Sequence, residues 1–248
     1  MERQHHLQLL PGEVGETVLL PGDVHRAKFI AERFDSAELV AHNRQYITYT
    51  GTYQGVKVSV TSTGIGCPAL AIAVEELIKV GARNFIRVGT CGILQKYIPT
   101  ASLIIATAAV RGDGTSREYF PLEYPAVADL HTLEALIAAA EKRGLKPFIG
   151  IIRSHDAFYM ESALARGDYL ARDKPWIESN VLSVENESSA LFTLATVRKC
   201  RAGTILAGGG HHQFPEQKIW GDELQDLIHQ ATLCALDAAV TLHRMDHK

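Results

Sequence analysis

The sequence predicts an α/β protein with one domain, residues 1–248, built on a mixed, mostly parallel central sheet that is flanked by helices. Short apolar runs of strand type alternate with longer segments whose apolar residues recur at helical spacing. This alternation is typical of a parallel sheet covered on both faces. The chain also shows no internal repeat and no low-complexity linker. A length of 248 residues therefore suits one large domain better than several small ones.

The first elements are a strand, a tight turn and a helix. Residues 17–20 form a short apolar run that stops at Pro21-Gly22-Asp23, and residues 24–34 carry apolar side chains at helical spacing. The segments 46–50 and 56–61 are rich in β-forming residues and flank two glycines. They predict a pair of antiparallel strands.

The remaining elements continue the alternation. Helices are expected at 67–80, 130–143, 186–198 and about 217–242, and strands at 84–88, 103–110, 148–152, 181–184 and 203–207. Polar or glycine-rich segments follow three of the strands, at 21–23, 89–92 and 185–187. Because ligands of such sheets sit at the carboxyl ends of the strands, these three segments are candidates for a binding site.

Composition and charge exclude several classes of partner. The formal net charge is −3 and the basic residues are scattered, whereas nucleic-acid binding needs a concentrated positive face. The most apolar stretch, residues 103–110, is too short to cross a bilayer, and the first residues lack the apolar region of a secretory signal. The four cysteines lie far apart without CxxC spacing. We therefore expect a cytoplasmic protein with reduced thiols and with neither nucleic acid nor membrane as a partner.

The histidines do not predict a metal site. The pairs His5-His6 and His211-His212 are adjacent and cannot chelate one ion from one helical face, and HExxH spacing is absent. The absence of G-x-S-x-G argues against a serine-hydrolase site, and the absence of G-x-G-x-x-G weakens a dinucleotide-binding interpretation. We expect no metal and no cofactor.

Pro21-Gly22-Asp23 and Arg26 form a candidate anion site. Glycine lets the backbone approach an anion, the following helix presents its N-terminal amide groups, and Arg26 lies one turn inside that helix to supply charge. A plain tight turn, with Asp23 as the N-cap and Arg26 on the surface, explains the same residues.

Arg87, near the end of a strand with a buried pattern, is the second candidate. A guanidinium is rarely desolvated without a partner. A phosphate shared with Arg26 would be such a partner, and the Thr90 hydroxyl could donate to the same anion. A carboxylate within the scaffold is the alternative partner.

Two acidic side chains, Glu185 and Glu187, open a predicted helix. Acidic residues favour a helix N-terminus and could simply cap it. Alternatively, one carboxylate could accept hydrogen bonds from the vicinal hydroxyls of a sugar. Phe158 follows another strand, where an aromatic ring can stack on a planar base or pack in the core.

Seven segments, taken in order, resemble one family. They are LLPGDVHRAKFIAERF, AHNRQYITYTGTYQG, VTSTGIGCPALAIAVEEL, IRVGTCGILQ, AAVRGDGTSREYFPLEYPAVAD, SHDAFY and VENESSALFTLA. The chain resembles the nucleoside phosphorylases of the trimeric or hexameric class, and within it the uridine phosphorylases most closely. The resemblance implies a pentosyltransferase that uses inorganic phosphate as co-substrate. It would cleave the N-glycosidic bond of a nucleoside, with a uridine-like substrate favoured, to free base and ribose 1-phosphate.

The resemblance also implies roles for individual residues. Arg87 and Glu187 would be catalytic. Phosphate would be bound by Gly22, Arg26, Arg44, Arg87 and Thr90, ribose by His6, Thr90, Asn186 and Glu187, and the base by Phe158, Ser162, Glu185, His211 and His212. Arg44 and His6 would act across a subunit interface, so the resemblance implies a homo-oligomer, either a dimer or a hexamer built as a trimer of dimers.

The sequence departs from the family pattern in three respects. Asn186 stands where relatives carry a methionine, and Ser162 and Leu164 stand where uridine phosphorylases present a glutamine and an arginine to the uracil edge. Purine-specific relatives use a late aspartate to protonate the leaving base, but residues 207–212 contain none. His211 or His212 could replace it, or this glycine-rich segment could be only a flexible loop. A purine nucleoside phosphorylase and a nucleosidase on the same scaffold therefore stay open as alternatives, as does a non-catalytic nucleoside-binding protein.

Overall fold

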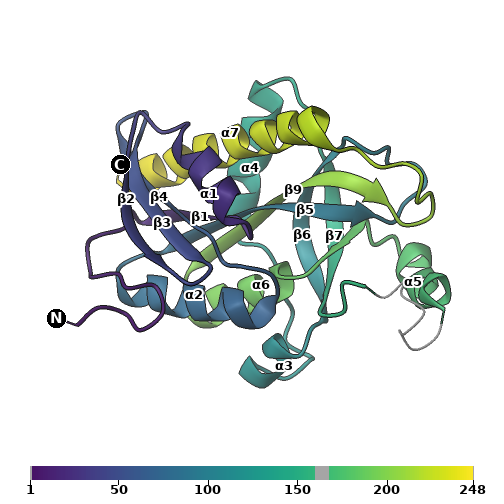
Figure 1. Ribbon diagram of the computed structural model, residues 1–248. Coiled ribbons are helices and arrows are strands. Elements are labelled where there is room, and N and C mark those ends of the chain that lie inside the picture. The colour runs from purple at the N-terminus through teal and green to yellow at the C-terminus, as the bar shows by residue number, and fades with distance from the viewer. Residues whose placement is uncertain (1, 160–167, 248) are drawn as a thin grey trace.

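The computed structural model describes residues 2–159 and 168–247, and a nine-stranded sheet forms their centre (Figure 1). The strands are β1 (Thr17–Leu20), β2 (Ser36–Asn43), β3 (Tyr46–Tyr53), β4 (Val56–Thr61), β5 (Asn84–Ile93), β6 (Leu103–Gly112), β7 (Phe148–His155), β8 (Ser183–Glu185) and β9 (Arg201–His211). Parallel pairings join β1 to β4 and β5, β5 to β9, and β7 to β6 and β8. The other four pairings are antiparallel, which confirms the predicted mixed, mostly parallel sheet.

Part of the sheet closes on itself. Strand β9 pairs with both β6 and β5, and β5 also pairs with β8. Strands β5, β8, β7, β6 and β9 therefore form a closed ring. Because of this closure, the carboxyl ends of β5 and β7 lie on either side of the short strand β8, and the residues at these ends come together.

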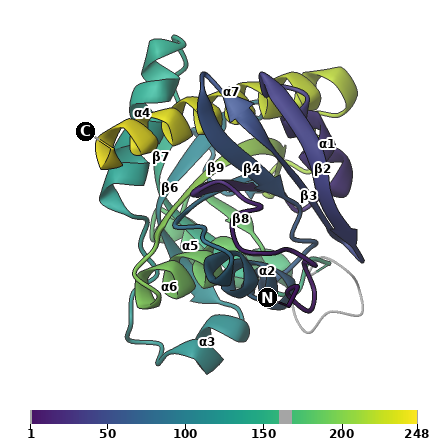
Figure 2. The ribbon, with the colours of Figure 1, turned by 90° about the vertical axis from the view of Figure 1, so that its left-hand side faces the viewer.

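Helices cover both faces of the sheet. They are α1 (Val24–Ala31), α2 (Cys67–Lys79), α3 (Thr115–Tyr119), α4 (Leu130–Lys142), α5 (Tyr169–Glu178), α6 (Ser188–Val197) and α7 (Gly221–Asp246). Figure 2 shows α4 and α7 on one side of the strands and α2 and α6 on the other. Each side has its own buried apolar cluster: α2 and α6 share one, and α1, α4 and α7 share the second. Among the described helices, none is long and apolar enough to cross a membrane.

Most of the elements lie where the sequence predicts them. Strands β1 and β4 match their expected bounds, whereas β5 continues to Ile93 through the glycine-rich segment that was expected to follow it. Pairing with β8 and β9 extends the strand through these residues. The segment Gly208-Gly209-Gly210 likewise belongs to β9 and is not a flexible loop. Strand β2 and helices α3 and α5 were not expected, and α5 contains Pro175 in its interior, which disfavours a helix in any pattern-based prediction.

Candidate active site

The turn after β1 brings Arg26 to the carboxyl end of the sheet. Asp23 is the N-cap of α1, and its carboxylate accepts a hydrogen bond of 2.9 Å from the backbone N–H of His25. Gly22 packs tightly on the neighbouring turn, because a Cβ at this position would lie 3.0 Å from the carbonyl oxygen of Gly64. The absence of a side chain at Gly22 therefore lets the two turns lie side by side. The predicted N-cap is confirmed, and Arg26 lies in the first turn of α1 as expected.

Arg87 lies in a buried cluster with two carboxylates. Its Nε donates to Glu185 at 2.8 Å and its Nη2 forms an ion pair with Glu187. The three side chains are only 5%, 1% and 4% exposed. The sequence left open whether the partner of Arg87 is a phosphate or a carboxylate, and in the structure two carboxylates fill that role. The cluster carries one positive and two negative charges.

This charge balance determines the pKa values within the cluster. Burial alone would lower the pKa of Arg87, but the negative charges of Glu187 and Glu185 raise it above its ordinary value. Burial raises the pKa of Glu187, and the charge of Glu185 adds to this effect although Arg87 opposes it. One cation cannot fully compensate two buried carboxylates. The second negative charge therefore makes Glu187 harder to ionise than an ordinary glutamate.

Arg26 lies close to the same cluster. Burial, followed by the positive charge of Arg87, lowers its pKa to about 10. Its Nη1 donates to the carbonyl of Val88 at 3.5 Å. Two neighbouring guanidiniums repel each other, and an anion between them would relieve that repulsion. This part of the site is suited to bind an oxyanion.

Glu185 holds the start of helix α6. Its carboxylate accepts from the backbone N–H groups of Glu187 and Ser188 at 3.0 Å and from the Ser154 hydroxyl. Together with Arg87, these donors satisfy both of its oxygens. The contacts favour the capping role over the base contact that the resemblance implies for Glu185, and the base contact stays a prediction.

Glu187 is held so that part of its carboxylate stays available. One oxygen accepts from the backbone N–H of Gly66 at 2.7 Å, and the other contacts Arg87. An ionised carboxylate offers about four lone-pair positions, so further hydroxyl donors can bind. This geometry suits the predicted acceptance of hydrogen bonds from a ribose.

The raised pKa of Glu187 predicts a specific pH dependence. The ionised carboxylate accepts from hydroxyls, so activity should fall on acidification with a midpoint above the ordinary value of 4.5. The pH profile of kcat/KM should be compared between the wild type and Glu187→Gln, because the titration of phosphate itself is common to both. A profile of unchanged shape in the variant would refute this assignment.

Asn186 and Thr90 lie beside the carboxylate cluster. The Asn186 side-chain amide donates to the backbone carbonyl of His155, which ties the end of β8 to the end of β7. Thr90 is half-buried on β5, three residues beyond Arg87. Their predicted roles in ribose and phosphate binding stay predictions.

His6 and Arg44 lie next to each other at the surface. The Asn43 side chain donates to the His6 carbonyl at 2.8 Å, which places the loop of Arg44 next to His6. The ring of His6 contacts Glu76 at 2.8 Å. Arg44 is exposed in the turn between β2 and β3. The proximity of these two residues suits the prediction that both serve the same neighbouring subunit.

The predicted base contacts occupy different environments. Phe158 is 63% exposed and packs against Tyr159 at a ring distance of 5.0 Å, so it is not a core residue. Both ring nitrogens of His211 have internal partners, the Gln95 carbonyl and the backbone N–H of Gln213. His212 is about one-third exposed and is the more accessible of the two. Ser162 and Leu164 lie outside the described residues.

One group of three side chains in the described ranges could share a cation. Glu16, His243 and His247 offer ligand atoms that all lie within 4.8 Å of one another. His243 lies in the last turn of α7 and His247 is the C-cap residue of that helix, and this spacing of four residues brings the two ring centres to 4.3 Å from each other, a signal that the adjacent histidine pairs do not carry. However, His247 already contacts Glu16 at 3.0 Å, which explains the group without a metal. The expectation of no metal stays a prediction.

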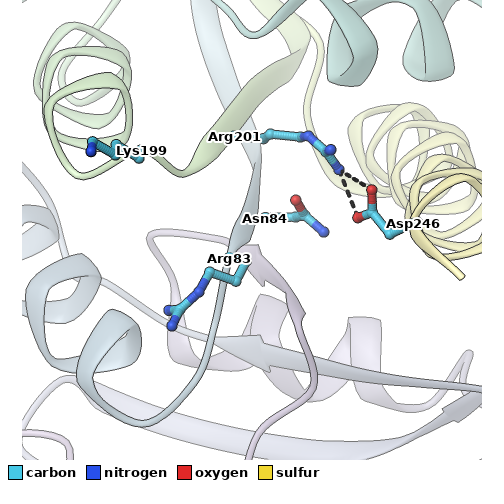
Figure 3. A pocket seen from close by; sticks show the side chains of 5 residues that line it. All are labelled: Arg83, Asn84, Lys199, Arg201 and Asp246. Atoms are coloured by element: carbon cyan, nitrogen blue, oxygen red, sulfur yellow. Dashed lines mark hydrogen bonds and ion pairs between the residues drawn. The ribbon is translucent and has the colours of Figure 1, made fainter.

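A separate pocket lies at the opposite ends of the strands. It has a volume of about 260 Å³ and is lined by Arg83, Asn84, Lys199, Arg201 and Asp246 (Figure 3). Asn84 and Arg201 are the first residues of β5 and β9, whereas Thr90 and Glu187 belong to the carboxyl ends. The two hydrogen bonds of Arg201 to Asp246 hold the pocket wall together. None of the predicted site residues lines this pocket.

The fold and the site define a class of protein: an α/β enzyme scaffold with a guanidinium pair beside a buried carboxylate. The family model of the phosphorylase superfamily matches residues 16–235. The uridine phosphorylase of Treponema pallidum (strain Nichols) is 44% identical over 98% of this chain and 95% of its own length. The guanosine phosphorylase of Halorubrum lacusprofundi is 40% identical over 98% of this chain and its full length. The crystal structure of uridine phosphorylase from Vibrio fischeri ES114 superimposes with a TM-score of 0.89 at 32% identity, covering 97% of this chain and 98% of the other.

The chain belongs to the phosphorylase superfamily. The resemblance to nucleoside phosphorylases, and to uridine phosphorylases in particular, is confirmed by these relatives. The expectation that the chain is an enzyme of the nucleoside phosphorylase type is confirmed with it.

Proposed function

We propose that this protein cleaves a uridine-like nucleoside with inorganic phosphate and releases the free base and ribose 1-phosphate. The observation that carries the proposal is the proximity of two guanidiniums, Arg26 and Arg87, to the buried carboxylate of Glu187. The first group suits phosphate and the second suits the hydroxyls of ribose. The names of two relatives above 40% identity, both uridine phosphorylases, support the choice of base.

The reaction follows from this placement of charges. Breaking the glycosidic bond leaves its electron pair on the base and builds positive charge on the ribose. A phosphate held by Arg26 beneath the anomeric carbon stabilises that cation and then forms the new C–O bond. The base anion takes a proton from solvent. Glu187 fixes the sugar through its hydroxyls, and Arg87 positions Glu187.

Phosphate dependence tests the proposal. The release of free uracil from uridine should be followed with saturating phosphate and in phosphate-free buffer. We expect turnover only with phosphate. Equal release in both buffers would favour a nucleosidase, and binding of uridine without release in either buffer would favour a non-catalytic nucleoside-binding protein.

A purine nucleoside is the second candidate substrate. The guanosine phosphorylase relative covers almost the whole chain at 40% identity, and purine nucleoside phosphorylases of the DeoD type reach 38%. The same assay with inosine and guanosine decides between the two bases.

We also infer a homo-oligomer in which Arg44 and His6 complete the site of a neighbouring subunit. Both lie on one surface patch, and Arg44 is exposed. A cytoplasmic location is proposed with it, because all four cysteines are free thiols.

Complementation between two inactive variants tests this arrangement. Arg44→Ala and Glu187→Gln should each be nearly inactive alone. In a mixed dimer, the subunit with Arg44→Ala keeps its own Glu187 and receives Arg44 from its partner, so one of the two sites is complete. About half of the dimers are mixed when equal amounts of the variants exchange subunits at random, so roughly a quarter of the wild-type activity should return in the whole sample. Activity that stays at the sum of the two separate variants would show that Arg44 does not act across an interface.

A further inference from the structure

Two neighbouring side chains on β7, Arg153 and His155, are buried with some of their polar atoms lacking a hydrogen-bond partner. Arg153 is 9% exposed and His155 8%. Among the described residues, four buried side-chain atoms lack a partner, and three of them are Arg153 Nε, Arg153 Nη1 and His155 Nδ1. Buried polar groups are normally satisfied, so a cluster of unsatisfied ones calls for a ligand that satisfies them.

The surroundings hold Arg153 in place but leave its donors free. Its guanidinium carbon lies 5.0 Å from the centre of the Trp176 ring, and its Nη1 is 3.9 Å from Asp173, too far for a hydrogen bond. Both partners come from α5, which lies at the right-hand edge of the molecule in Figure 1. The guanidinium is therefore positioned by a stacked ring and a nearby carboxylate, with N–H groups still unpaired.

A chain of contacts connects these side chains to the candidate active site. Asp173 accepts from the ring of His212 at 2.7 Å, and that ring lies against Gly92, where a Cβ would come within 2.6 Å of it. Gly92 is two residues from Thr90, so both lie on the same face of β5.

The second connection runs through the backbone. The carbonyl of His155 accepts from Asn186, the residue before Glu187. Ser154 lies between Arg153 and His155 on the strand, so its side chain points to the opposite face, where its hydroxyl donates to Glu185. The contacts of Arg153 and His155 thus lead to β5, the strand of Thr90, on one side and to Asn186, the neighbour of Glu187, on the other.

We propose that Arg153 and His155 determine base specificity by reading an oxo edge of the leaving base. Arg153 donates to an exocyclic oxygen, and His155 Nδ1 accepts from the neighbouring ring N–H. Uracil, thymine, hypoxanthine and guanine present this pair, whereas cytosine and adenine present an amino group beside an unprotonated nitrogen. The inference rests on the proposed function and specifies the chemistry of its substrate.

The protonation state of His155 agrees with this assignment. Burial, with the positive charge of Arg153 next in effect, lowers the pKa of His155. The ring is therefore neutral near pH 7 and can present Nδ1 as an acceptor. In this assignment, Arg153 donates to the base as the base gains negative charge on breaking of the glycosidic bond, so the contact strengthens in the transition state.

A panel of nucleosides tests the proposal. We would measure kcat/KM with phosphate for uridine, inosine, cytidine and adenosine in the wild type, in Arg153→Met and in His155→Phe. In the wild type, kcat/KM for the preferred oxo nucleoside, uridine or inosine, should be about 100-fold or more above kcat/KM for cytidine and for adenosine. The reason is that a site built for hydrogen bonds rejects an analogue that lacks them. Arg153→Met should lower kcat/KM for the oxo nucleoside by about 100-fold and change kcat/KM for cytidine little, so the preference for oxo over amino nucleosides should be lost. His155→Phe should also lower the preference for oxo nucleosides.

Thermal stability separates this role from a scaffold role. Arg153→Met removes a buried cation whose Nε and Nη1 have no hydrogen-bond partner, and Asp173 keeps its contact with His212 at 2.7 Å, so the Tm should stay close to that of the wild type. Arg244→Met, on the exposed surface of α7, is the matched control and should change neither Tm nor preference. A lower Tm with an unchanged ratio of oxo to amino nucleosides would overturn the proposal.

Binding of free bases keeps the two hypotheses distinguishable. Uracil or hypoxanthine should raise the Tm of the wild type, cytosine and adenine should not, and Arg153→Met should abolish the shift. If no nucleoside is cleaved but this pattern holds, the proposed function fails and the assignment of Arg153 is supported. If uridine is cleaved but Arg153→Met keeps the wild-type preference, the inference alone fails.

Discussion

Arg87→Met should lower the free energy of unfolding by about 3–5 kcal/mol, the loss typical of breaking a buried ion pair. Arg87 is the cation between Glu185 and Glu187, and all three side chains are at most 5% exposed. Without the guanidinium, two carboxylates would stay buried next to each other with no positive charge between them. Urea unfolding followed by circular dichroism measures the change.

A surface ion pair supplies the control for this prediction. Arg201 pairs with Asp246 at 2.7 Å, but both side chains are more than a quarter exposed, so Arg201→Met should cost about 0–1 kcal/mol. An equally small loss for Arg87→Met would mean that the carboxylate cluster is not ionised as described. Because Arg87→Met is expected to be unstable, its loss of activity alone does not test a role in phosphate binding.

Glu187→Gln should lower kcat/KM by about 10²–10³-fold while the protein stays folded, the range typical of removing one preorganised electrostatic contact. The substitution keeps the size of the side chain and an oxygen that can accept from Gly66. It also leaves Arg87 paired with Glu185 alone, so the buried charges balance. This variant should therefore lose activity without losing stability.

Glu75→Gln is the matched control for Glu187→Gln. Glu75 pairs with Arg198 at the surface, where the arginine is 45% exposed, and we expect wild-type kinetics from this variant. Steady-state kinetics with uridine and phosphate, together with a melting curve for each variant, make the comparison. A loss of stability that parallels the loss of activity in Glu187→Gln would assign Glu187 to the scaffold and not to the sugar.

Local patterns were sufficient to predict much of the fold. The apolar run of β1, its end at Pro21 and the cap at Asp23 are signals within seven residues, and all appear in the structure. The missed elements lack such signals. Helix α5 is polar and interrupted by Pro175, so only its tertiary contacts, such as Trp176 against Arg153, reveal it.

The site was predictable as a set of residues but not as a set of contacts. Arg87 and its carboxylates are 98 and 100 residues apart, and only the pairing of β5 with β8 brings them together. Arg153 and His212 are also far apart in the sequence, and both contact Asp173 of α5. In the sequence, the available signal for the proposed base-reading residues was an arginine and a histidine on the same face at the end of a strand, as in Arg153-Ser154-His155.

Phosphorus NMR of uridine incubated with this protein and inorganic phosphate tests phosphorolysis directly. We expect a new sugar-phosphate signal that grows at the same rate as free uracil, with an equal loss of inorganic phosphate. Uracil that appears without this signal, or no uracil and no new signal at all, would contradict the assignment of Arg26, Arg87 and Glu187 to phosphorolysis.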